Sequence, residues 1–139
     1  MHRAYGTHRV SNARRAIAEA SARIGCAFTV EDLHRSVTRI LPGVGLATVY
    51  RAVAAMLGTG YIACVGTRCG KALYAVCEGG AHHHHLVCTS CGAVTPLPCS
   101  LEAQLATSAR RAGYTLTSHE VTLYGTCNAC SRGASPLER

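Results

Sequence analysis

Apolar residues recur at helical spacing through the first third of the chain. From Asn12 to Ile24 they fall on one face of a helix, which Gly25 is expected to end (Ala13, Ala16, Ile17, Ala20, Ile24). Thr29 predicts the start of a second helix, because Asp32 stands three residues later in a capping-box position. The buried stripe of this second helix is expected at Leu33, Val37 and Ile40, and Pro42-Gly43 is expected to break the chain.

A third helix and a hairpin are predicted next. Ala47–Leu57 has helical periodicity, with four inward positions, and the stretch from Gly58 to Gly60 closes it (Val49, Val53, Met56, Leu57). Two short strands follow at Tyr61–Val65 and Ala72–Val76, joined by a turn that contains Gly66 and Gly70. Three short helices followed by a hairpin are typical of a winged helix-turn-helix, in which the last helix enters the major groove of DNA.

The pattern changes after residue 80. His82–Val87 is predicted to be a strand, Leu101–Ala112 an amphipathic helix, and Thr115–Tyr124 a further strand with imperfect alternation. Such a unit has few apolar positions, so we expect it to need a metal and a partner subunit for stability. The predicted fold is α+β, with a winged-helix DNA-binding domain at 1–77, a hinge at about 76–81 and a small zinc-stapled α/β domain at 82–139.

All the excess positive charge lies in the first half of the chain. Residues 1–75 contain ten Lys and Arg against three acidic residues, whereas residues 76–139 contain four of each. This asymmetry favours one module that faces a polyanion and a second module with different chemistry. A generically basic surface is the alternative. On this interpretation Tyr50 and Arg51 face the DNA groove, and Arg9, Arg14, Arg15 and Lys71 contact phosphates. In the competing interpretation Tyr50 packs against a neighbouring helix and Arg51 is merely solvated.

Cysteine usage indicates metal chemistry. The sequence contains nine cysteines in 139 residues and no segment typical of a signal peptide or membrane span. We therefore expect a soluble cytoplasmic protein, in which thiols stay reduced. Cys88-Thr-Ser-Cys91 and Cys127-Asn-Ala-Cys130 are two Cys-x-x-Cys hooks, and two such hooks supply four thiolates to one tetrahedral zinc ion.

Four consecutive histidines, His82 to His85, directly precede the first hook. Because side chains alternate along a strand, His82 and His84 would face one side and His83 and His85 the other. The run therefore predicts two histidine-containing sites rather than one. A solvated polar loop or a tag remnant is the alternative, but the run is internal and continues directly into Leu86-Val87-Cys88.

Three stretches resemble the Fur family of metal-dependent bacterial repressors, and within it most closely the zinc-uptake regulators. They are Gly45-Leu46-Ala47-Thr48-Val49-Tyr50-Arg51, His82 through Cys91, and Tyr124-Gly125-Thr126-Cys127 with Cys130. The resemblance runs from about the first helix to Cys130. It implies a winged helix joined by a hinge to an α/β dimerisation domain, with Thr48, Tyr50 and Arg51 in the recognition helix.

The resemblance also implies three ligand sets. Cys88, Cys91, Cys127 and Cys130 match a structural zinc site. Cys77, His83 and His85 match three ligands of a hinge sensor site, and His82, His84, Glu102 and His119 match an additional site. The family's acidic hinge ligand is replaced by Ala63, which leaves Cys64, Cys69 or water as the fourth ligand. A second thiolate would favour zinc over iron or manganese. Cys64 as a small buried core residue is the competing interpretation, and Cys26 and Cys99 are interpreted as residues without function.

The implied function is zinc-responsive repression of zinc-uptake genes. It requires a homodimer with two to three Zn²⁺ per protomer on an inverted-repeat DNA operator, with no membrane and no small-molecule substrate. Within the same fold, sensing of nickel, iron or peroxide is the alternative. A thiol-disulfide enzyme would need a lone hook at a helix N-terminus. A zinc hydrolase would need an open coordination position and a general base such as Glu102 or Glu120, and the sequence has no HExxH motif.

Overall fold

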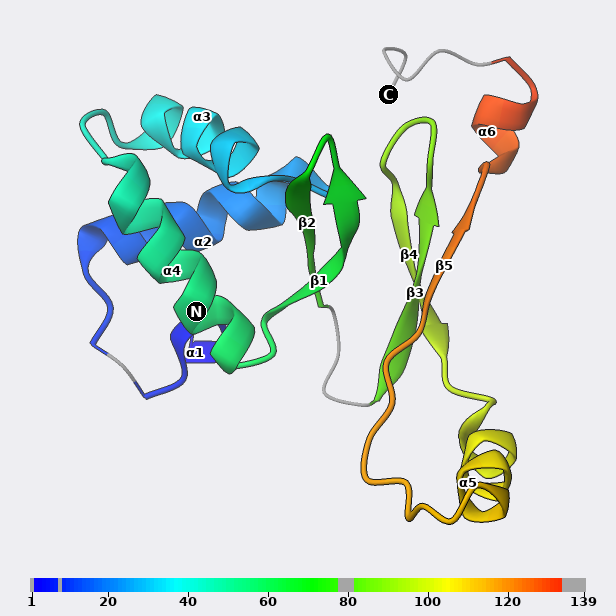
Figure 1. Cartoon of the computed structure of the whole chain (residues 1–139). Coiled ribbons are helices and arrows are strands. Elements are labelled where there is room, and N and C mark those ends of the chain that lie inside the picture. The colour runs from blue at the N-terminus through cyan, green and yellow to red at the C-terminus, as the bar shows by residue number, and fades with distance from the viewer. Residues whose placement is uncertain (1, 8, 78–81, 134–139) are drawn as a thin grey trace.

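The computed structural model describes residues 2–7, 9–77 and 82–133. A helical N-terminal region ends in a β-hairpin, and a three-stranded sheet with one helix at each end follows it (Figure 1). The N-terminal elements are α1 His2–Tyr5, α2 Asn12–Ile24, α3 Val30–Ile40, α4 Leu46–Gly58, β1 Ile62–Arg68 and β2 Lys71–Val76. The C-terminal elements are β3 His83–Cys88, β4 Val94–Pro98, α5 Glu102–Arg111, β5 Thr122–Gly125 and α6 Asn128–Ser131. The predicted boundaries 1–77 and 82–139 stay a prediction, and most of the predicted hinge lies outside the described residues.

Local chemistry places the first two predicted helices. The Ser11 hydroxyl caps α2 by accepting from the amide of Arg14, and Gly25 ends it in the left-handed conformation with φ 68°. At α3 the Thr29 hydroxyl accepts from the amide of Asp32, whose carboxylate accepts from the amide of Thr29 in return. Both helix starts and the capping box are confirmed. A cap of this kind stabilises a helix by about 1 kcal/mol.

The N-terminal core lies between α1, α2, α3 and α4. Its most buried large side chains are Tyr5, Ile17, Phe28, Leu33, Val37, Val49 and Met56. The short helix α1 was not predicted, yet its Ala4 and Tyr5 are fully enclosed, and the Tyr5 hydroxyl donates to the carbonyl of Arg14. The predicted inward position of Leu57 is wrong, since its side chain is 37 % exposed. Leu57 follows Met56 by one residue, a turn of about 100° that carries it off the stripe.

The hairpin β1–β2 is antiparallel and irregular at one point. Its register shifts between Cys64 and Gly66, where Gly66 has φ 148°. A Cβ atom at Gly66 would lie 2.6 Å from the hydroxyl of Tyr124, and φ 148° is a conformation that other residues rarely adopt, so glycine is strongly favoured there. That hydroxyl donates to the carbonyl of Val65 at 2.7 Å. The bulge therefore lets strand β5 of the C-terminal domain approach the hairpin.

A small apolar cluster joins the two domains. It contains Ala27, Val65, Leu73, Ala75 and Val87, with Val94 packed against it. Close by, the amide of Ala27 donates to the carbonyl of Gly92 at 2.8 Å. Residues from the hairpin, the α2–α3 connection and the C-terminal sheet thus share one interface.

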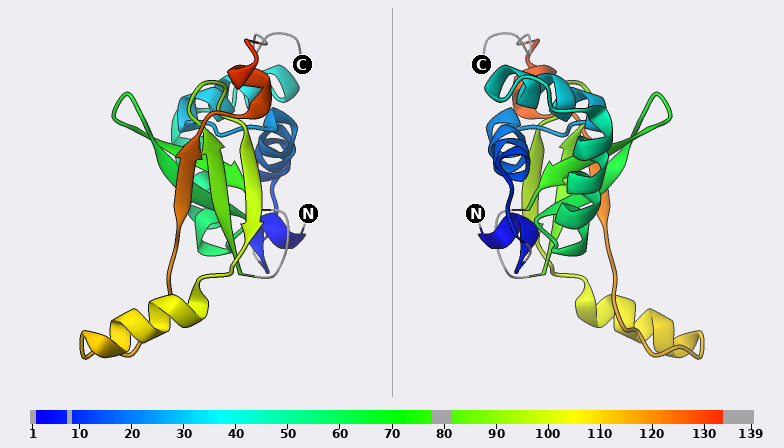
Figure 2. Two further views of the ribbon diagram at one scale, coloured as in Figure 1. Left: turned by 90° about the vertical axis from the view of Figure 1, so that its right-hand side faces the viewer. Right: turned by 90° about the vertical axis from the view of Figure 1, so that its left-hand side faces the viewer.

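The C-terminal sheet has strand order β4-β3-β5, with β3 antiparallel to β4 and parallel to β5. The predicted strand at Thr115–Tyr124 is wrong over most of its length, because only Thr122–Gly125 pairs with β3. The preceding residues instead return the chain from α5, which extends away from the rest of the molecule (Figure 2). None of the side chains of α5 or α6 is buried. In the part of the chain that the structure describes, no helix has the length and apolarity needed to cross a membrane.

Candidate metal centres and nucleic-acid interface

The two Cys-x-x-Cys hooks meet beyond one end of the sheet. Cys88 is the last residue of β3, and the parallel register that pairs it with Gly125 brings Cys127 alongside. The Sγ atoms of Cys88, Cys91, Cys127 and Cys130 all lie within 4.8 Å of one another. Strand pairing thus assembles one four-thiol cluster from hooks that are 35 residues apart in sequence.

Hydrogen bonds to Cys88 favour its negatively charged thiolate, the form that binds a cation. The amide of Cys127 donates to Cys88 Sγ at 3.3 Å. Amide donors, Cys127 first and Cys91 second, lower the pKa of Cys88 to about 6, which favours its thiolate. Hydrogen bonding with Cys127, followed by burial, raises the pKa of Cys130 to about 12. Four adjacent thiols can all ionise only beside a cation, and four thiolates are the donor set of a closed structural zinc site.

A second cluster links the hairpin to the C-terminal sheet. Cys77 directly follows β2, and its amide donates to the carbonyl of Tyr61 at 2.8 Å. Its Sγ lies 3.7 Å from Nε2 of His85, and the rings of His83 and His85 are 4.9 Å apart. Ligand atoms of Cys77, His83 and His85 fall within 4.8 Å of one another. Burial raises the pKa of Cys77, and burial with the neighbouring His83 lowers the pKa of His85, so both groups favour their uncharged forms.

Neither cysteine considered as a fourth hinge ligand joins this cluster in the described residues. Cys64 lines the same cavity of about 670 Å³ as Cys77, His83 and His85, but its Sγ lies against the carbonyl of Gly66 at 3.7 Å. Its side chain is exposed, so the competing interpretation as a buried core residue is wrong. The register pairs Ile62 with Val76 and Arg68 with Lys71, which places Cys69 at the far end of the hairpin. Six residues of strand span about 20 Å, too far for Cys69 to reach the cluster.

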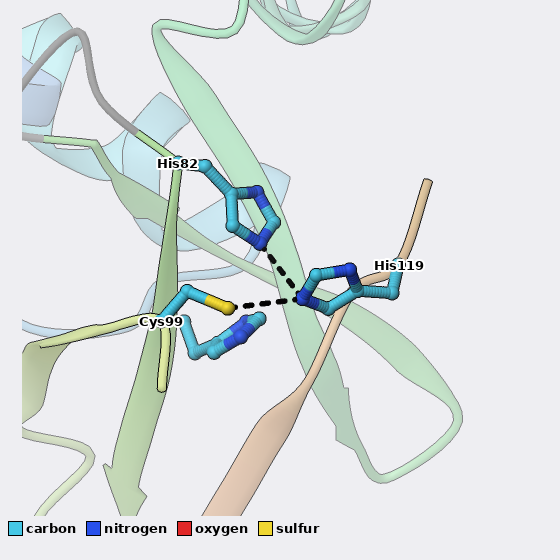
Figure 3. A group of neighbouring side chains, drawn as sticks. His82, Cys99 and His119 are labelled. Carbon is cyan, nitrogen blue, oxygen red and sulfur yellow. Dashed lines mark hydrogen bonds between the residues drawn. The ribbon is translucent and has the colours of Figure 1, made fainter. Parts of the chain in front are cut away.

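A third cluster lies on the opposite face of β3, as alternation along the strand predicts. His82, His84, Cys99 and His119 have ligand atoms within 4.8 Å of one another (Figure 3). His119 Nε2 is 3.0 Å from His82 Nε2 and 3.1 Å from Cys99 Sγ. Both ring nitrogens of His84 are buried and have no hydrogen-bond partner among the described residues. Burial, with the neighbouring imidazoles, lowers the pKa of His84 and keeps its ring neutral, the form that binds metal.

The membership of this cluster differs from the predicted ligand set at two residues. Glu102, the predicted carboxylate, is the exposed first residue of α5 and does not belong to the group. Cys99, interpreted as a residue without function, does belong to it. The cause is strand pairing: β3 and β4 pair His83 with Pro98, so the next residues along, His82 and Cys99, are neighbours. Periodicity in the sequence carries no information about that register.

The basic residues divide between two faces. Burial of Val49, Ala52, Val53 and Met56 turns Tyr50 and Arg51 of α4 outward, with Tyr50 50 % exposed. The interpretation of Tyr50 as a packed residue is therefore wrong. Arg51 donates to the hydroxyl of Thr48 at 3.2 Å. Arg9, Ser11, Arg14, Thr48 and Arg51 together line a shallow cavity of about 350 Å³.

Two further basic residues lie elsewhere. Arg15 is exposed on α2 and does not line this cavity. Lys71 is on the hairpin, where its ammonium forms an ion pair with Glu31 at 2.8 Å, and Arg68 forms one with Asp32 at 2.6 Å. Exposed ion pairs of this kind hold the hairpin only weakly, because solvent screens the charges, and phosphate can displace them. Contact of these residues with DNA stays a prediction.

Comparison with known proteins identifies this arrangement. The sequence profile described as "Ferric uptake regulator family" matches residues 6–124. The chain belongs to the Ferric uptake regulator family. Its members are metal-dependent transcriptional regulators, so the chain is a regulator and not an enzyme.

Individual relatives differ in the metal that they are named for. The "Ferric uptake regulation protein" of Bordetella parapertussis is 34 % identical over 107 residues, which cover 76 % of each chain. The "Zinc uptake regulation protein" of Mycobacterium tuberculosis is 32 % identical over 103 residues, covering 73 % of this chain and 78 % of the relative. A solved structure titled "Zinc Uptake Regulator Complexed With Zinc AND DNA" superposes with a TM-score of 0.77 at 22 % identity, over 92 % of this chain and 87 % of that one. The fold class expected from the sequence is confirmed.

Proposed function

We propose that this chain is a zinc-responsive repressor of zinc-uptake genes that acts as a homodimer on an inverted-repeat DNA operator in the cytoplasm. The observation that carries the proposal is the cluster of Cys77, His83 and His85. It contains a thiol, it lies between the β1–β2 hairpin and the C-terminal sheet, and it is separate from the four-thiol cluster. A donor set of one thiolate and two imidazoles suits zinc better than iron or manganese.

The two clusters have different roles in this proposal. The four cysteines hold a permanent zinc ion that keeps the C-terminal domain folded. Zinc bound at Cys77, His83 and His85 would supply a cross-link between the end of β2 and strand β3. The amide of Cys77 donates to the carbonyl of Tyr61, so Cys77 moves together with the hairpin. With zinc bound, the three side chains would join the DNA-binding domain to the C-terminal sheet and fix the angle between the two.

An uncovered apolar surface supports the homodimer. Leu86 and Leu123 are paired across β3 and β5 and are 36 % and 46 % exposed. The apolar positions of α5 lack a covering element as well. Such a face is the kind that a second copy of the chain would cover. With the angle between domains fixed, Tyr50 and Arg51 of both protomers would meet major grooves separated by whole turns of DNA.

The test is fluorescence anisotropy on an AT-rich inverted-repeat duplex, with free zinc, iron(II), manganese and nickel each set by a metal buffer. We expect tight binding to appear only as free zinc rises. Cys77→Ser should lower zinc-dependent affinity by at least about tenfold, a coupling of roughly 1.4 kcal/mol, and leave a folded dimer. Cys64→Ser is the matched control, because that thiol lines the same cavity outside the cluster. Zinc-dependent binding that persists in Cys77→Ser would refute the hinge assignment.

The same experiment decides between metals. Relatives named for ferric uptake are as similar to this chain as those named for zinc uptake. A stronger response to iron(II) would keep the fold and the DNA partner and change the sensed metal. Iron(II) prefers harder donors than thiolate, so the Cys77 thiol favours the zinc outcome.

A further inference from the structure

The third cluster is joined to a feature that the proposed function leaves unexplained. Residues 100–118, here called the α5 arm, leave the sheet after β4 and return to it before β5 (Figure 2). None of the side chains of α5 is buried. Cys99 and His119 are the two residues that flank the arm. We propose that His82, His84, Cys99 and His119 form a thiolate-containing metal site that clamps the base of the α5 arm.

The geometry places four donors around one position. Three come from different segments that meet there: His82 from just before β3, Cys99 from just after β4 and His119 from the return segment (Figure 3). Nε2 of His119 lies 3.0 Å from His82 and 3.1 Å from Cys99. The ring of His84 lies 4.9 Å from that of His82 and 5.0 Å from that of His119.

His84 supplies an independent reason to expect a ligand. It is only 4 % exposed, and neither of its ring nitrogens has a hydrogen-bond partner in the described residues. A buried imidazole with neither nitrogen bonded is unfavourable, because its lost hydration is not replaced. A cation at the centre of the cluster would give one of these two nitrogens a partner.

The fourth donor decides which ion fits. Three imidazoles and one thiolate form a tetrahedral N/S set, which suits zinc and disfavours the harder manganese and iron(II). A carboxylate in place of Cys99 would accept those harder ions more readily. Binding would release the thiol proton of Cys99 to solvent, and no other group needs to change its chemistry.

The clamp would control an arm that little else restrains. Before a metal binds, the contact between Cys99 and His119 joins the two ends of the arm at 3.1 Å. Coordination of both side chains by one ion would fix the direction in which α5 leaves the sheet. The consequence for self-association rests on the homodimer of the proposed function, whereas the ligand assignment does not.

The first experiment follows cobalt(II), a spectroscopic substitute for zinc, in protein whose four-thiol cluster is already filled with zinc. Cys77→Ser is the background, so Cys99 is the one remaining thiol in a described cluster able to bind the added ion. We expect a tetrahedral cobalt spectrum with a sulfur-to-cobalt charge-transfer band. Further substitution Cys99→Ser should remove that band and weaken cobalt binding at least about tenfold, since even loss of an outer-sphere partner costs 10–100-fold. Glu102→Gln is the matched control and should change neither.

Three outcomes would overturn the ligand assignment. They are a charge-transfer band that survives Cys99→Ser, a loss of binding in Glu102→Gln alone, and a background protein that binds no added cobalt. Cys99→Asp provides a second variant should the serine protein fail to fold. It should keep a site but lose preference for zinc over manganese, and an unchanged preference would contradict the role of sulfur.

The second experiment tests the clamp by amide hydrogen exchange over residues 100–118. Zinc should slow exchange there in the Cys77→Ser background and leave it unchanged when Cys99→Ser is added. Exchange that zinc does not slow would refute the clamp even with the ligands confirmed. Because Cys77→Ser removes the hinge response, success here is independent of zinc-dependent DNA binding. The two proposals can therefore fail separately.

Discussion

The two halves of this chain are held together by different means. Residues 4–62 share one hydrophobic core in which Tyr5, Phe28, Leu33 and Met56 are almost completely buried. After residue 82, the buried apolar side chains of the described residues are Val87 and Cys88 alone. The C-terminal half instead carries all four residues of the four-thiol cluster and all four residues of the third cluster. A strand and helix unit of this size cannot offset its conformational entropy by apolar burial, so ligand binding has to supply the difference.

In the proposed function, the regulatory metal binds where these two kinds of stabilisation meet. The N-terminal core contains no residue of the three described clusters and presents Tyr50 and Arg51 on the outward face of α4. In the proposed function, the C-terminal half is the part that responds to metal. Cys77, between the two, belongs to the hairpin by its backbone and to the histidines of β3 by its sulfur. A metal that binds there has two well-defined bodies to join, which is what a two-state switch requires.

Removal of the structural metal is the largest expected effect. Cys127→Ser breaks the four-thiolate set, and structural zinc of this type contributes about 10–16 kcal/mol in small metal-dependent domains. We expect the C-terminal half to lose protection in amide hydrogen exchange while α2, α3 and α4 keep theirs. Cys64→Ser, an exposed thiol outside the cluster, is the control. A Cys127→Ser protein with a protected C-terminal sheet would contradict the assignment of a structural site.

Truncation of an apolar residue should lower the free energy of unfolding much more in the N-terminal half than in the C-terminal half. Leu33→Ala empties a fully buried position in the N-terminal core and should cost about 2–5 kcal/mol of unfolding free energy. Leu105→Ala, on α5 where no side chain is buried, should cost about 0.5 kcal/mol or less in the monomer. Urea denaturation of the zinc-loaded proteins at low concentration measures both. Equal losses would show that the C-terminal half has a core of its own.

The contact between Tyr124 and the hairpin should contribute least to the free energy of unfolding. Tyr124→Phe removes the hydrogen bond to the carbonyl of Val65 and should cost about 0.5–1.5 kcal/mol, at the low end because Tyr124 is 58 % exposed. Gly66→Ala should cost more, because its Cβ would meet the Tyr124 hydroxyl at 2.6 Å and φ 148° strains any other residue. Thermal unfolding of both variants and of Gly66→Ala/Tyr124→Phe measures the coupling. A double variant as unstable as the sum of both would show that the two residues do not interact.

The sequence predicted correctly those features that depend on residues three or four positions apart. The bounds of α2, the capping box of Thr29 and Asp32 and the alternating faces of His82 to His85 all follow from neighbours in the sequence. The predictions that failed depended on partners distant in the chain. Residues 115–121 have strand-like character but no strand to pair with, and Cys99 acquired its neighbours through the register of β3 and β4.

The sequence by itself determined which residues could bind metal and on which face of a strand each histidine would lie, because ligand type and side-chain alternation are local properties. Only the tertiary structure decided which ligands share a site. Parallel pairing of β3 with β5 joined the two hooks, the hairpin delivered Cys77 to His85, and antiparallel pairing with β4 put Cys99 where a carboxylate was expected. A metal site collects atoms within a few ångströms regardless of their separation along the chain, and strand register sets those distances.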